Sequence, residues 1–244
     1  MNIPYLRITG WGDAIRALYM SNKNYTPELE KRISEAEIAH ELMQYNHMAL
    51  SDPTELNWFL NEINKVIKYG NKHITLLRYV DVAWVVVGLH RGAQDDFDAH
   101  AERYDNRIVR MSTRTKNDEK LAEVSDWYKD KILTWQDLEK IFELPEEVST
   151  EKGDFVRTAF GYIRKDFIGT KEEGDVRRGN VPLAVASTFM VKCQVTELCH
   201  VFRERNEKGN AAPELKAMME MLVKMISDQY PNLNRDFFLN SCLQ

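Results

Sequence analysis

The chain has 244 residues, of which 43% are hydrophobic and 29% charged, and its formal net charge is −5. This length is enough to bury a sizeable core, and the low numbers of glycine (11) and proline (7) exclude collagen-like and low-complexity classes. The acidic balance argues against a protein that coats nucleic acid, but it is compatible with a few local arginines that bind a small anion. No apolar run is long enough to span a membrane, and no signal-peptide pattern is present. We therefore expect a soluble, cytoplasmic protein that forms a single domain over residues 1–244.

The cysteine and histidine patterns give no metal site. Cys193, Cys199 and Cys242 form no C-x-x-C pair and no zinc spacing, which is typical of a reducing compartment. The segment that begins at His40 departs from the zinc-protease pattern H-E-x-x-H, because Gln44 occupies the second ligand position. We therefore expect His40 to be a surface histidine and predict no bound metal.

Helical signals dominate the chain in sequence order. Thr26-Pro27 predicts the start of a helix that ends near His47, and Ser51-Asp52-Pro53 predicts the start of a second, which ends near Tyr69. The apolar run Val80–Val87 predicts a buried strand. Further helices are expected over 93–104, 115–131, 134–143, 152–167, from Pro182 to about Arg205, and from Pro213 to just before Pro231. The pattern indicates a helix-rich α+β protein with few strands.

The common nucleotide and hydrolase motifs are absent, and the arginines are the remaining functional candidates. There is no G-x-G-x-x-G, no P-loop and no G-x-S-x-G element. Four arginines at spacings of four, three and four share one face if their segment is helical: Arg103, Arg107, Arg110 and Arg114. Further arginines occur at Arg177-Arg178 and at Arg203 and Arg205. Guanidinium groups bind phosphate oxygens well, so these arginines either converge on one phosphorylated ligand or form solvated ion pairs with nearby carboxylates.

From residue 52 onward the chain resembles the flavin-dependent thymidylate synthase family in the order of several segments. His73-Ile74-Thr75 is similar to the family's H-x-T element, which contacts the flavin. The strand Val80–Val87 and the helix Ala93–Arg103 follow without a gap, and the family's Arg-His-Arg triplet falls on that helix. Residues Asp105–Ser112 then lie under the family's N-E-x-S-x-R-Y-S stretch.

The second half of the chain is collinear with the same family. The segment Arg178–Leu183 is similar to A-R-x-x-L-P-L, whose arginine contacts the nucleotide. Residues Pro182–Arg205 align without a gap to the segment that carries a flavin-binding Asn and a nucleotide-binding Arg. Asn210–Leu215 resembles H-A-Q-W-E-I. The resemblance thus covers about residues 52–114 and 175–240.

This sequence departs from the family pattern at several motif positions. In the ungapped register the Arg-His-Arg triplet falls on Asp98-Ala99-His100, the motif glutamate on Asn106 and the serine on Ile108, whereas the arginine is kept as Arg110. A rival register places Leu89-His90-Arg91 on the triplet but requires two extra residues before Arg103-Tyr104. We prefer the ungapped register, in which the chain is a divergent member of the family.

The resemblance implies a fold and an activity. The expected fold is α+β, helix-rich, with a small antiparallel sheet flanked by helices. The expected enzyme is an FAD-dependent thymidylate synthase that converts dUMP to dTMP, with methylenetetrahydrofolate as carbon donor and NADPH as reductant. A homotetramer with shared active sites is also implied, with no nucleic-acid polymer and no membrane as partner. Because the electron chemistry belongs to the flavin, the protein mainly positions ligands and supplies electrostatics.

The resemblance also assigns residues to ligands. Arg110 and Arg205 are the implied catalytic residues, because arginines can stabilise negative charge on the pyrimidine. The residues implied for dUMP are Arg107, Arg110, Ser112, Arg178 and Arg205. The residues implied for FAD are His73, Thr75, His100, Arg103, Gln194 and His200.

Two alternatives remain open from the sequence. Changes at the motif positions Asn106 and Ile108 suggest a relative that performs other flavin and folate chemistry on a pyrimidine nucleotide, such as hydroxymethylation. A non-catalytic nucleotide-binding homologue that has lost the flavin is the second alternative.

Overall fold

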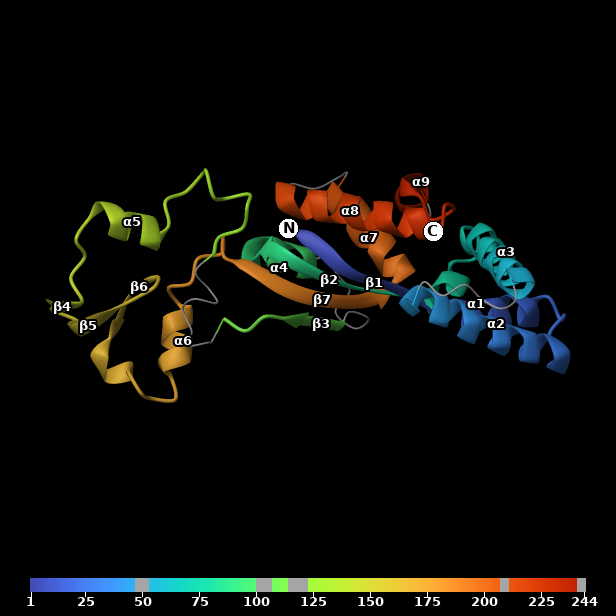
Figure 1. Cartoon of the computed structure of the whole chain (residues 1–244), viewed down its shortest axis with the longest axis horizontal. Helices are drawn as coiled ribbons and strands as arrows, with labels where there is room; N and C mark the ends of the chain where they lie inside the picture. Colours follow the sequence, from blue (N-terminus) through green and yellow to red (C-terminus); the bar gives the residue numbers. More distant parts are fainter. Residues whose placement is uncertain (47–52, 100–106, 114–122, 207–210, 241–244) are drawn as a thin grey trace.

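The chain forms a body around one antiparallel sheet, with an arm that projects from one end of that sheet (Figure 1). The computed structural model describes residues 1–46, 53–99, 107–113, 123–206 and 211–240. None of the helices within these residues is both long and apolar enough to cross a membrane. The same residues contain no group of three side chains that could hold a metal ion.

The central sheet has four antiparallel strands in the order β1 (Asn2–Thr9), β2 (Asp81–His90), β7 (Ala186–Gln194) and β3 (Arg107–Arg110). In the middle of the sheet, Phe189 of β7 pairs with Val86 and with Arg110. Alternate β7 side chains, including Phe189 and Val191, are buried. This period of two is the strand signature, and one face of the sheet therefore belongs to the core.

Three helices pack on the strands of the sheet, α4 (Arg91–Asp98), α7 (Val195–Asn206) and α8 (Pro213–Gln229), and α9 (Arg235–Asn240) packs on α7 and α8. Figure 1 shows α4, α7 and α8 above the sheet. The Phe97 ring of α4 packs edge-on against Trp84 at 5.9 Å and against Phe189 at 6.0 Å between ring centroids. Aromatic pairs of this kind bury a large apolar area and fix α4 on the sheet.

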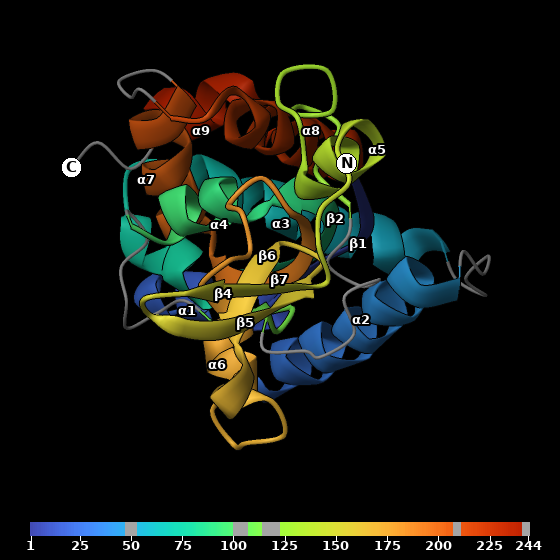
Figure 2. The same ribbon diagram turned by 90° about the vertical axis from the view of Figure 1, so that its left-hand side faces the viewer.

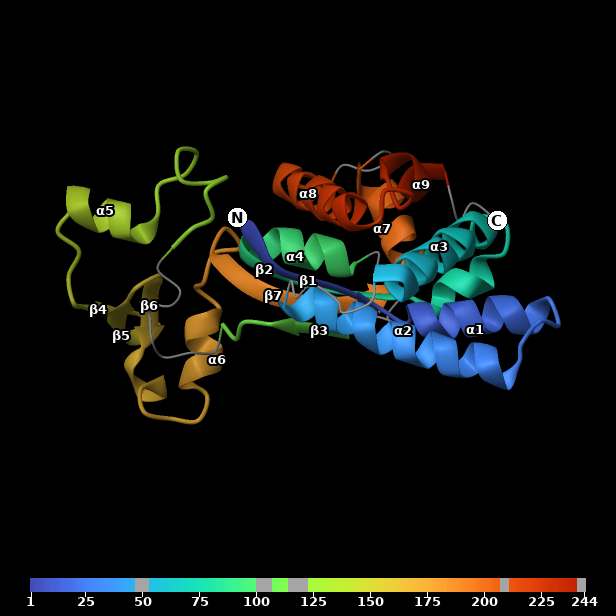
Figure 3. The same ribbon diagram turned by 45° about the vertical axis from the view of Figure 1, so that its right-hand side comes forward.

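A second group of helices lies at the other end of the sheet (Figure 3): α1 (Trp11–Ser21), α2 (Pro27–Asn46), α3 (Pro53–Gly70) and the 3₁₀ helix η1 (Ile74–Tyr79). The apolar residues of α3 recur at helical spacing, so that Phe59, Ile63, Val66 and Ile67 are all buried. Gly10, with φ of 86°, precedes α1, and a Cβ there would lie 2.0 Å from the Tyr79 carbonyl oxygen. Only glycine allows this close approach of α1 to η1.

In the sequence, the arm follows β3 and precedes β7, and it faces the viewer in Figure 2. It contains α5 (Trp135–Ile141), a three-stranded sheet of β4 (Glu147–Thr150), β5 (Gly153–Thr158) and β6 (Gly161–Arg164), the 3₁₀ helix η3 (Lys165–Phe167) and α6 (Glu173–Arg178). An antiparallel bridge between Val124 and Val185 joins the two ends of the arm at its base.

The expected fold class is confirmed, as are the helices predicted to begin near Thr26, Ser51 and Pro213 and the buried strand at Val80–Val87. The helix predicted over 134–143 corresponds to α5. The helix expected over 93–104 corresponds to α4, which begins at Arg91; residues 100–104 lie outside the described ones.

Three predicted helices are wrong. The segment from Pro182 to Arg205 contains strand β7 before α7 begins at Val195. Residues 152–167 form a hairpin, in which Gly161 has φ of 137° at the turn between β5 and β6, followed by the 3₁₀ helix η3. Within 115–131, the described residues from 123 on are turns and a bridge rather than a helix. In β7 and the hairpin, β-branched and aromatic residues alternate with polar ones, and cross-strand pairing overrides the weaker helical pattern.

Candidate functional site

Three arginines from different elements lie close together at the base of the arm. They are Arg91, the first residue of α4, Arg110, the last of β3, and Arg178, the last of α6. Burial lowers the pKa of Arg91, and the positive charges of Arg110 and Arg178 lower it further, whereas the nearby Asp95 acts in the opposite direction. We call these three residues the arginine cluster. Like charges that lie near one another are costly unless anions balance them, and Asp95, whose carboxylate lies 3.8 Å from Arg91 Nε and also contacts Arg110, balances part of this charge.

Backbone hydrogen bonds bring the arm to the start of α4. The Arg91 N–H donates to the Val185 carbonyl at 3.1 Å, and the Gly92 N–H donates to the Leu183 carbonyl at 3.1 Å. The chain that leaves α6 is thereby fixed against the first turn of α4. This connection places Arg178 beside Arg91 although 87 positions separate them in the sequence.

The members of the arginine cluster differ in how many protein partners they have. Arg110 donates to Asp98 at 2.8 Å, to the Gln94 carbonyl at 3.1 Å and to Asp95, so α4 fixes its side chain. The Nη1 atom of Arg91 is buried and has no hydrogen-bond partner among the described residues. Arg178 is exposed, and within the described part of the chain its guanidinium group has no hydrogen-bond or ion-pair partner. Two of the three guanidinium groups therefore have donor capacity left for a ligand.

A buried hydrogen-bonded pair, His90 and Glu214, fixes the backbone next to Arg91. Glu214, near the start of α8, accepts from the His90 backbone N–H at 3.1 Å and also contacts His90 Nδ1. Both side chains are almost fully buried, and the Tyr128 ring packs edge-on against the His90 ring at 4.9 Å. Hydrogen bonds from His90 lower the pKa of Glu214 although burial opposes this shift. Glu214 therefore sets the position of the β2–α4 junction from which Arg91 projects.

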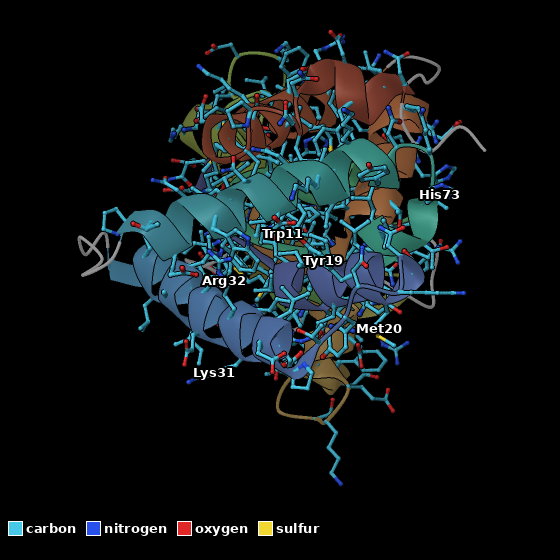
Figure 4. All side chains as sticks on the ribbon, turned by 90° about the vertical axis from the view of Figure 1, so that its right-hand side faces the viewer. Trp11, Tyr19, Met20, Lys31, Arg32 and His73 are labelled. Carbon is cyan, nitrogen blue, oxygen red and sulfur yellow. The ribbon has the colours of Figure 1, made fainter. Side chains whose placement is uncertain are left out.

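A cavity of about 530 Å³ lies at the other end of the sheet, between α1, the end of α3 and η1. Its lining includes His73 and Thr75, together with the aromatic side chains of Tyr69 and Tyr79, and we call it the His73 cavity. Figure 4 shows His73 and Met20 at this end of the molecule. The volume lies in the range of small-molecule sites, and exposed aromatic rings beside polar groups are typical of sites for planar ligands.

Two more of the residues implied for FAD lie near the same end. Gln194 is the last residue of β7 and pairs with Asp81, which directly follows the η1 segment; its Oε1 accepts from the Thr196 hydroxyl at 3.4 Å. His200 is half-buried on α7, which packs against η1. His100 and Arg103, also implied for FAD, lie outside the described residues.

Other residues implied for dUMP lie away from the arginine cluster or are occupied by protein contacts. Arg107 and Arg110 lie on opposite faces of β3, and the Arg107 Nη1 atom lies 3.6 Å from Asp81 Oδ2. Arg205 is buried and forms an ion pair with Asp96, with 3.1 Å between Arg205 Nη1 and Asp96 Oδ1. Its Nη2 atom also donates to the Asp96 carbonyl. Ser112 is exposed just beyond β3. Arg107 and Arg110 do not share a helical face, because their segment is a strand; Arg103 and Arg114 lie outside the described residues.

Arg91 and the His73 cavity lie at opposite ends of β2, whereas the Arg110 backbone pairs with Phe189 in the middle of the sheet. β2 begins at Asp81, next to the His73 cavity, and ends at His90, next to Arg91. A ten-residue strand spans about 30 Å, since each residue rises roughly 3.3 Å. Within one chain, Arg91 is therefore about 30 Å along β2 from the end next to the His73 cavity, and the backbone of Arg110 lies between the two.

Arg91 is the functional candidate that the preferred alignment missed. The rival register, which places Leu89-His90-Arg91 on the family's Arg-His-Arg triplet, contains the signal that could have identified it. The ungapped register instead stresses His100, which is not among the described residues.

Comparisons with known proteins find the same fold elsewhere. No protein-family model and no curated protein sequence matches the chain. Two structures of flavin-dependent thymidylate synthase X from Helicobacter pylori with FAD and dUMP are similar in structure. One is 14% identical over 98% of this chain and 100% of that chain, with a TM-score of 0.53; the other is 15% identical over all of both chains, with a TM-score of 0.54. A UMP/dUMP methylase, PolB, from Streptomyces cacaoi bound with 5-Br dUMP is 11% identical over 99% of this chain and 95% of that chain, with a TM-score of 0.52.

These similarities extend over nearly the whole length of each chain at low sequence identity. They confirm at the level of fold the resemblance that the order of the sequence segments indicates. The chain has the fold of the flavin-dependent thymidylate synthases.

Proposed function

We propose that this protein is a flavin-dependent enzyme that methylates dUMP, and that the arginine cluster binds the nucleotide. The observation that carries the proposal is the juxtaposition of Arg91, Arg110 and Arg178, two of which have donors left without a protein partner. Guanidinium groups hold a phosphate dianion by paired, charge-assisted hydrogen bonds. The fold shared with dUMP-binding structures supports this assignment.

The His73 cavity is the proposed site of FAD. Its aromatic and polar lining fits a planar ring with hydrogen-bonding edges, and His73 and Thr75 are the two residues of the H-x-T element. Gln194 and His200 from β7 and α7, together with His100 and Arg103, complete the proposed flavin set. When bound, the flavin supplies hydride transfer, which no side chain of the protein can provide.

The chain's own residues bind, orient and stabilise charge. The Arg91 and Arg178 guanidinium groups hold the nucleotide phosphate, and Arg110, fixed by Asp95 and Asp98, keeps its orientation during binding. An arginine whose guanidinium group lies beside the pyrimidine stabilises the negative charge that develops on the ring when its C5 atom attacks the carbon donor. Ser112, Arg107 and Arg205 are secondary candidates on the basis of the family motifs, Arg205 after release from Asp96.

The complete proposal includes the co-substrates, the assembly and the location implied by the family. Methylenetetrahydrofolate is the proposed carbon donor and NADPH the proposed reductant. The proposed assembly is a homotetramer, and the separation of the two candidate regions supports active sites that are shared between subunits. The use of free, buried Cys193 and Cys199 supports a cytoplasmic location.

Titration and product analysis test the proposal. The purified protein is expected to bind FAD, seen as quenching of flavin fluorescence, and dUMP, measured by calorimetry. With NADPH and methylenetetrahydrofolate, mass spectrometry of the nucleotide product is expected to show an added methyl group. A product that carries an added hydroxymethyl group would show the alternative chemistry instead of methylation. The absence of flavin binding on titration would exclude a flavoenzyme.

A further inference from the structure

A cavity of about 430 Å³ lies between α3 and the segment that leads into α9 (Figure 3). Its volume lies in the range of small-molecule sites, and it shares no described lining residue with the His73 cavity. None of its described lining residues is acidic, and six are amides or lysines: Asn61, Asn64, Asn71, Asn232, Lys65 and Lys68. We call it the amide cavity.

The helical period of α3 produces one wall of the amide cavity. Asn61, Asn64, Lys65 and Lys68 have the spacing i, i+3, i+4 and i+7, so they lie on one exposed face of the helix, opposite the face that packs in the core. A polar row of this kind is by itself typical of a solvated helix face. The cavity therefore depends on a second wall.

A hydrogen bond joins this face of α3 to the second wall. The Asn232 Nδ2 atom donates to Asn64 Oδ1 at 2.6 Å. The segment that carries Asn232 is itself fixed, because Leu233 is fully buried and Asn234 Oδ1 accepts from the Phe237 N–H at 3.0 Å at the start of α9. The amide cavity is thus formed between two fixed walls before any ligand binds.

The charge of the amide cavity favours an anion. Lys65 is balanced by the buried Glu62, to which its Nζ atom donates at 2.7 Å. Lys68 has no hydrogen-bond or ion-pair partner within the described part of the chain. The last carbonyls of α3, which would repel an anion, already accept backbone N–H groups, that of Ile67 from Asn71 at 3.1 Å and that of Tyr69 from residue 73 at 2.9 Å.

We propose that the amide cavity binds a phosphorylated sugar. The ammonium group of Lys68 pairs with the phosphate. The side-chain amides of Asn61 and Asn71 have no partner among the described residues, and each offers both a donor and an acceptor, which is what sugar hydroxyl groups require. Ile67 and Phe237, which are 3% and 8% exposed, add a small apolar surface for the C–H face of the sugar ring. This site stands on its own lining and does not depend on the proposed function.

Calorimetric titration with ribose 5-phosphate tests the site. The titrated protein is the full chain with Arg91→Ala and Arg178→Ala, so that binding of phosphate at the arginine cluster does not contribute. Ribose 5-phosphate is expected to bind at least about tenfold more tightly than ribose or inorganic phosphate, since each of these supplies only part of the contacts.

Two further substitutions in that chain assign the binding to the amide cavity. Lys68→Gln and Asn61→Leu change exposed side chains, so the circular dichroism spectrum is expected to stay unchanged, and each is expected to weaken ribose 5-phosphate binding about tenfold. The matched controls are Lys72→Gln and Asn57→Leu. They change an exposed lysine and an exposed asparagine four residues away that do not line the cavity, and are expected to leave the affinity within about twofold.

The same titrations can overturn the proposal and identify the source of the ligand. No binding of ribose 5-phosphate at millimolar concentration, equal affinity for inorganic phosphate, or unchanged affinity in the Lys68→Gln and Asn61→Leu variants would each overturn it. AMP that binds as tightly as ribose 5-phosphate would identify the sugar phosphate of a nucleotide as the ligand. Exclusion of AMP would identify a free sugar phosphate.

Discussion

At the scale of single residues, the arginine cluster concentrates positive charge where three elements meet. Arg110 has its charge balanced by α4 carboxylates, whereas Arg91 has a buried Nη1 atom without a partner among the described residues. The cluster is thus arranged to gain contacts when an anion binds. Arg205, by contrast, is already bound by Asp96 and connects α7 to α4.

The first prediction concerns nucleotide binding. Arg91→Ala and Arg178→Ala are each expected to weaken dUMP binding by about tenfold to a hundredfold, since charge-assisted hydrogen bonds contribute roughly 1.5–3 kcal/mol. Calorimetric titration measures the effect. Arg164→Ala is the matched control, because this exposed arginine of the arm forms an ion pair with Asp166 and is not part of the arginine cluster, so the variant is expected to bind dUMP like the wild type. Unchanged affinity in both cluster variants would remove them from the site.

His40 is a second informative residue, and its predicted surface position is wrong. It is buried with 3% exposure, and its Nε2 lies 3.1 Å from the Tyr230 hydroxyl, which accepts in turn from Gln44 at 2.8 Å. Helix α2, which carries it, packs on α1 and α3, and the Phe59 ring of α3 lies 5.2 Å from the His40 ring between centroids. Burial lowers the pKa of His40 to about 4, because the charged imidazole loses its hydration.

This shift predicts a pH dependence of stability. Since the folded-state pKa of His40 lies below the unfolded value, the neutral form stabilises the fold above about pH 6.5, and this contribution is lost as the pH falls toward 4. The free energy of unfolding is expected to fall by about 1–2 kcal/mol between pH 8 and pH 5 from this group. Urea unfolding of the wild type and of His40→Gln measures it. The variant should lose this part of the pH dependence, and an equal pH slope in both proteins would contradict the assignment.

At the scale of elements, glycines and hydrogen bonds decide how neighbouring helices meet. The α1–η1 contact depends on Gly10, whose φ of 86° and closeness to the Tyr79 carbonyl leave no room for a side chain. At the other end of the sheet, Glu214 of α8 holds the β2–α4 junction through His90. These contacts place the His73 cavity and Arg91 on rigid elements.

Gly10→Ala tests the α1–η1 contact. The left-handed backbone alone costs an alanine about 1 kcal/mol, and the approach of 2.0 Å to the Tyr79 carbonyl adds to it, so the free energy of unfolding should fall by more than about 2 kcal/mol. Gly169→Ala is the control, since it also has a positive φ of 78° but no atom lies within 4 Å of its Cβ position. Chemical denaturation that gave equal losses for both variants would show that the contact is not tight.

At the scale of the whole molecule, the body and the arm divide the proposed functions. The body carries the His73 cavity, and the arm contributes Arg178 to the arginine cluster. The Val124–Val185 bridge holds the ends of the arm together, so the arm can be removed with little change to the sheet.

Replacement of residues 127–180 by a short glycine-serine linker tests this division. The shortened chain is expected to unfold cooperatively and to bind FAD with unchanged affinity, because α1, α3 and η1 remain. It is expected to lose dUMP binding by at least about tenfold, since it lacks Arg178. Fluorescence and calorimetric titrations measure the two affinities. Retention of wild-type dUMP affinity would place the nucleotide site elsewhere on the body.

The amino-acid sequence by itself determined the elements with strong local signals. The capping residues at Thr26, the proline at Pro213 and the apolar period of α3 predict helices correctly, because their causes lie within a few residues. The collinear motifs also indicated the fold, which the structure confirms, and the nucleotide role that they assign to Arg110 and Arg178 stays a prediction.

Only the tertiary structure decided which side chains meet. Residues 186–194 form a strand because they pair with β2 and β3, and the burial of His40 depends on Phe59 of α3 and on Tyr230. Likewise, Arg91 joins Arg178 only because hydrogen bonds to Leu183 and Val185 bring the arm onto α4. Such contacts join residues far apart in sequence, so no local pattern encodes them, and the energy of packing and pairing outweighs local propensity where the two conflict.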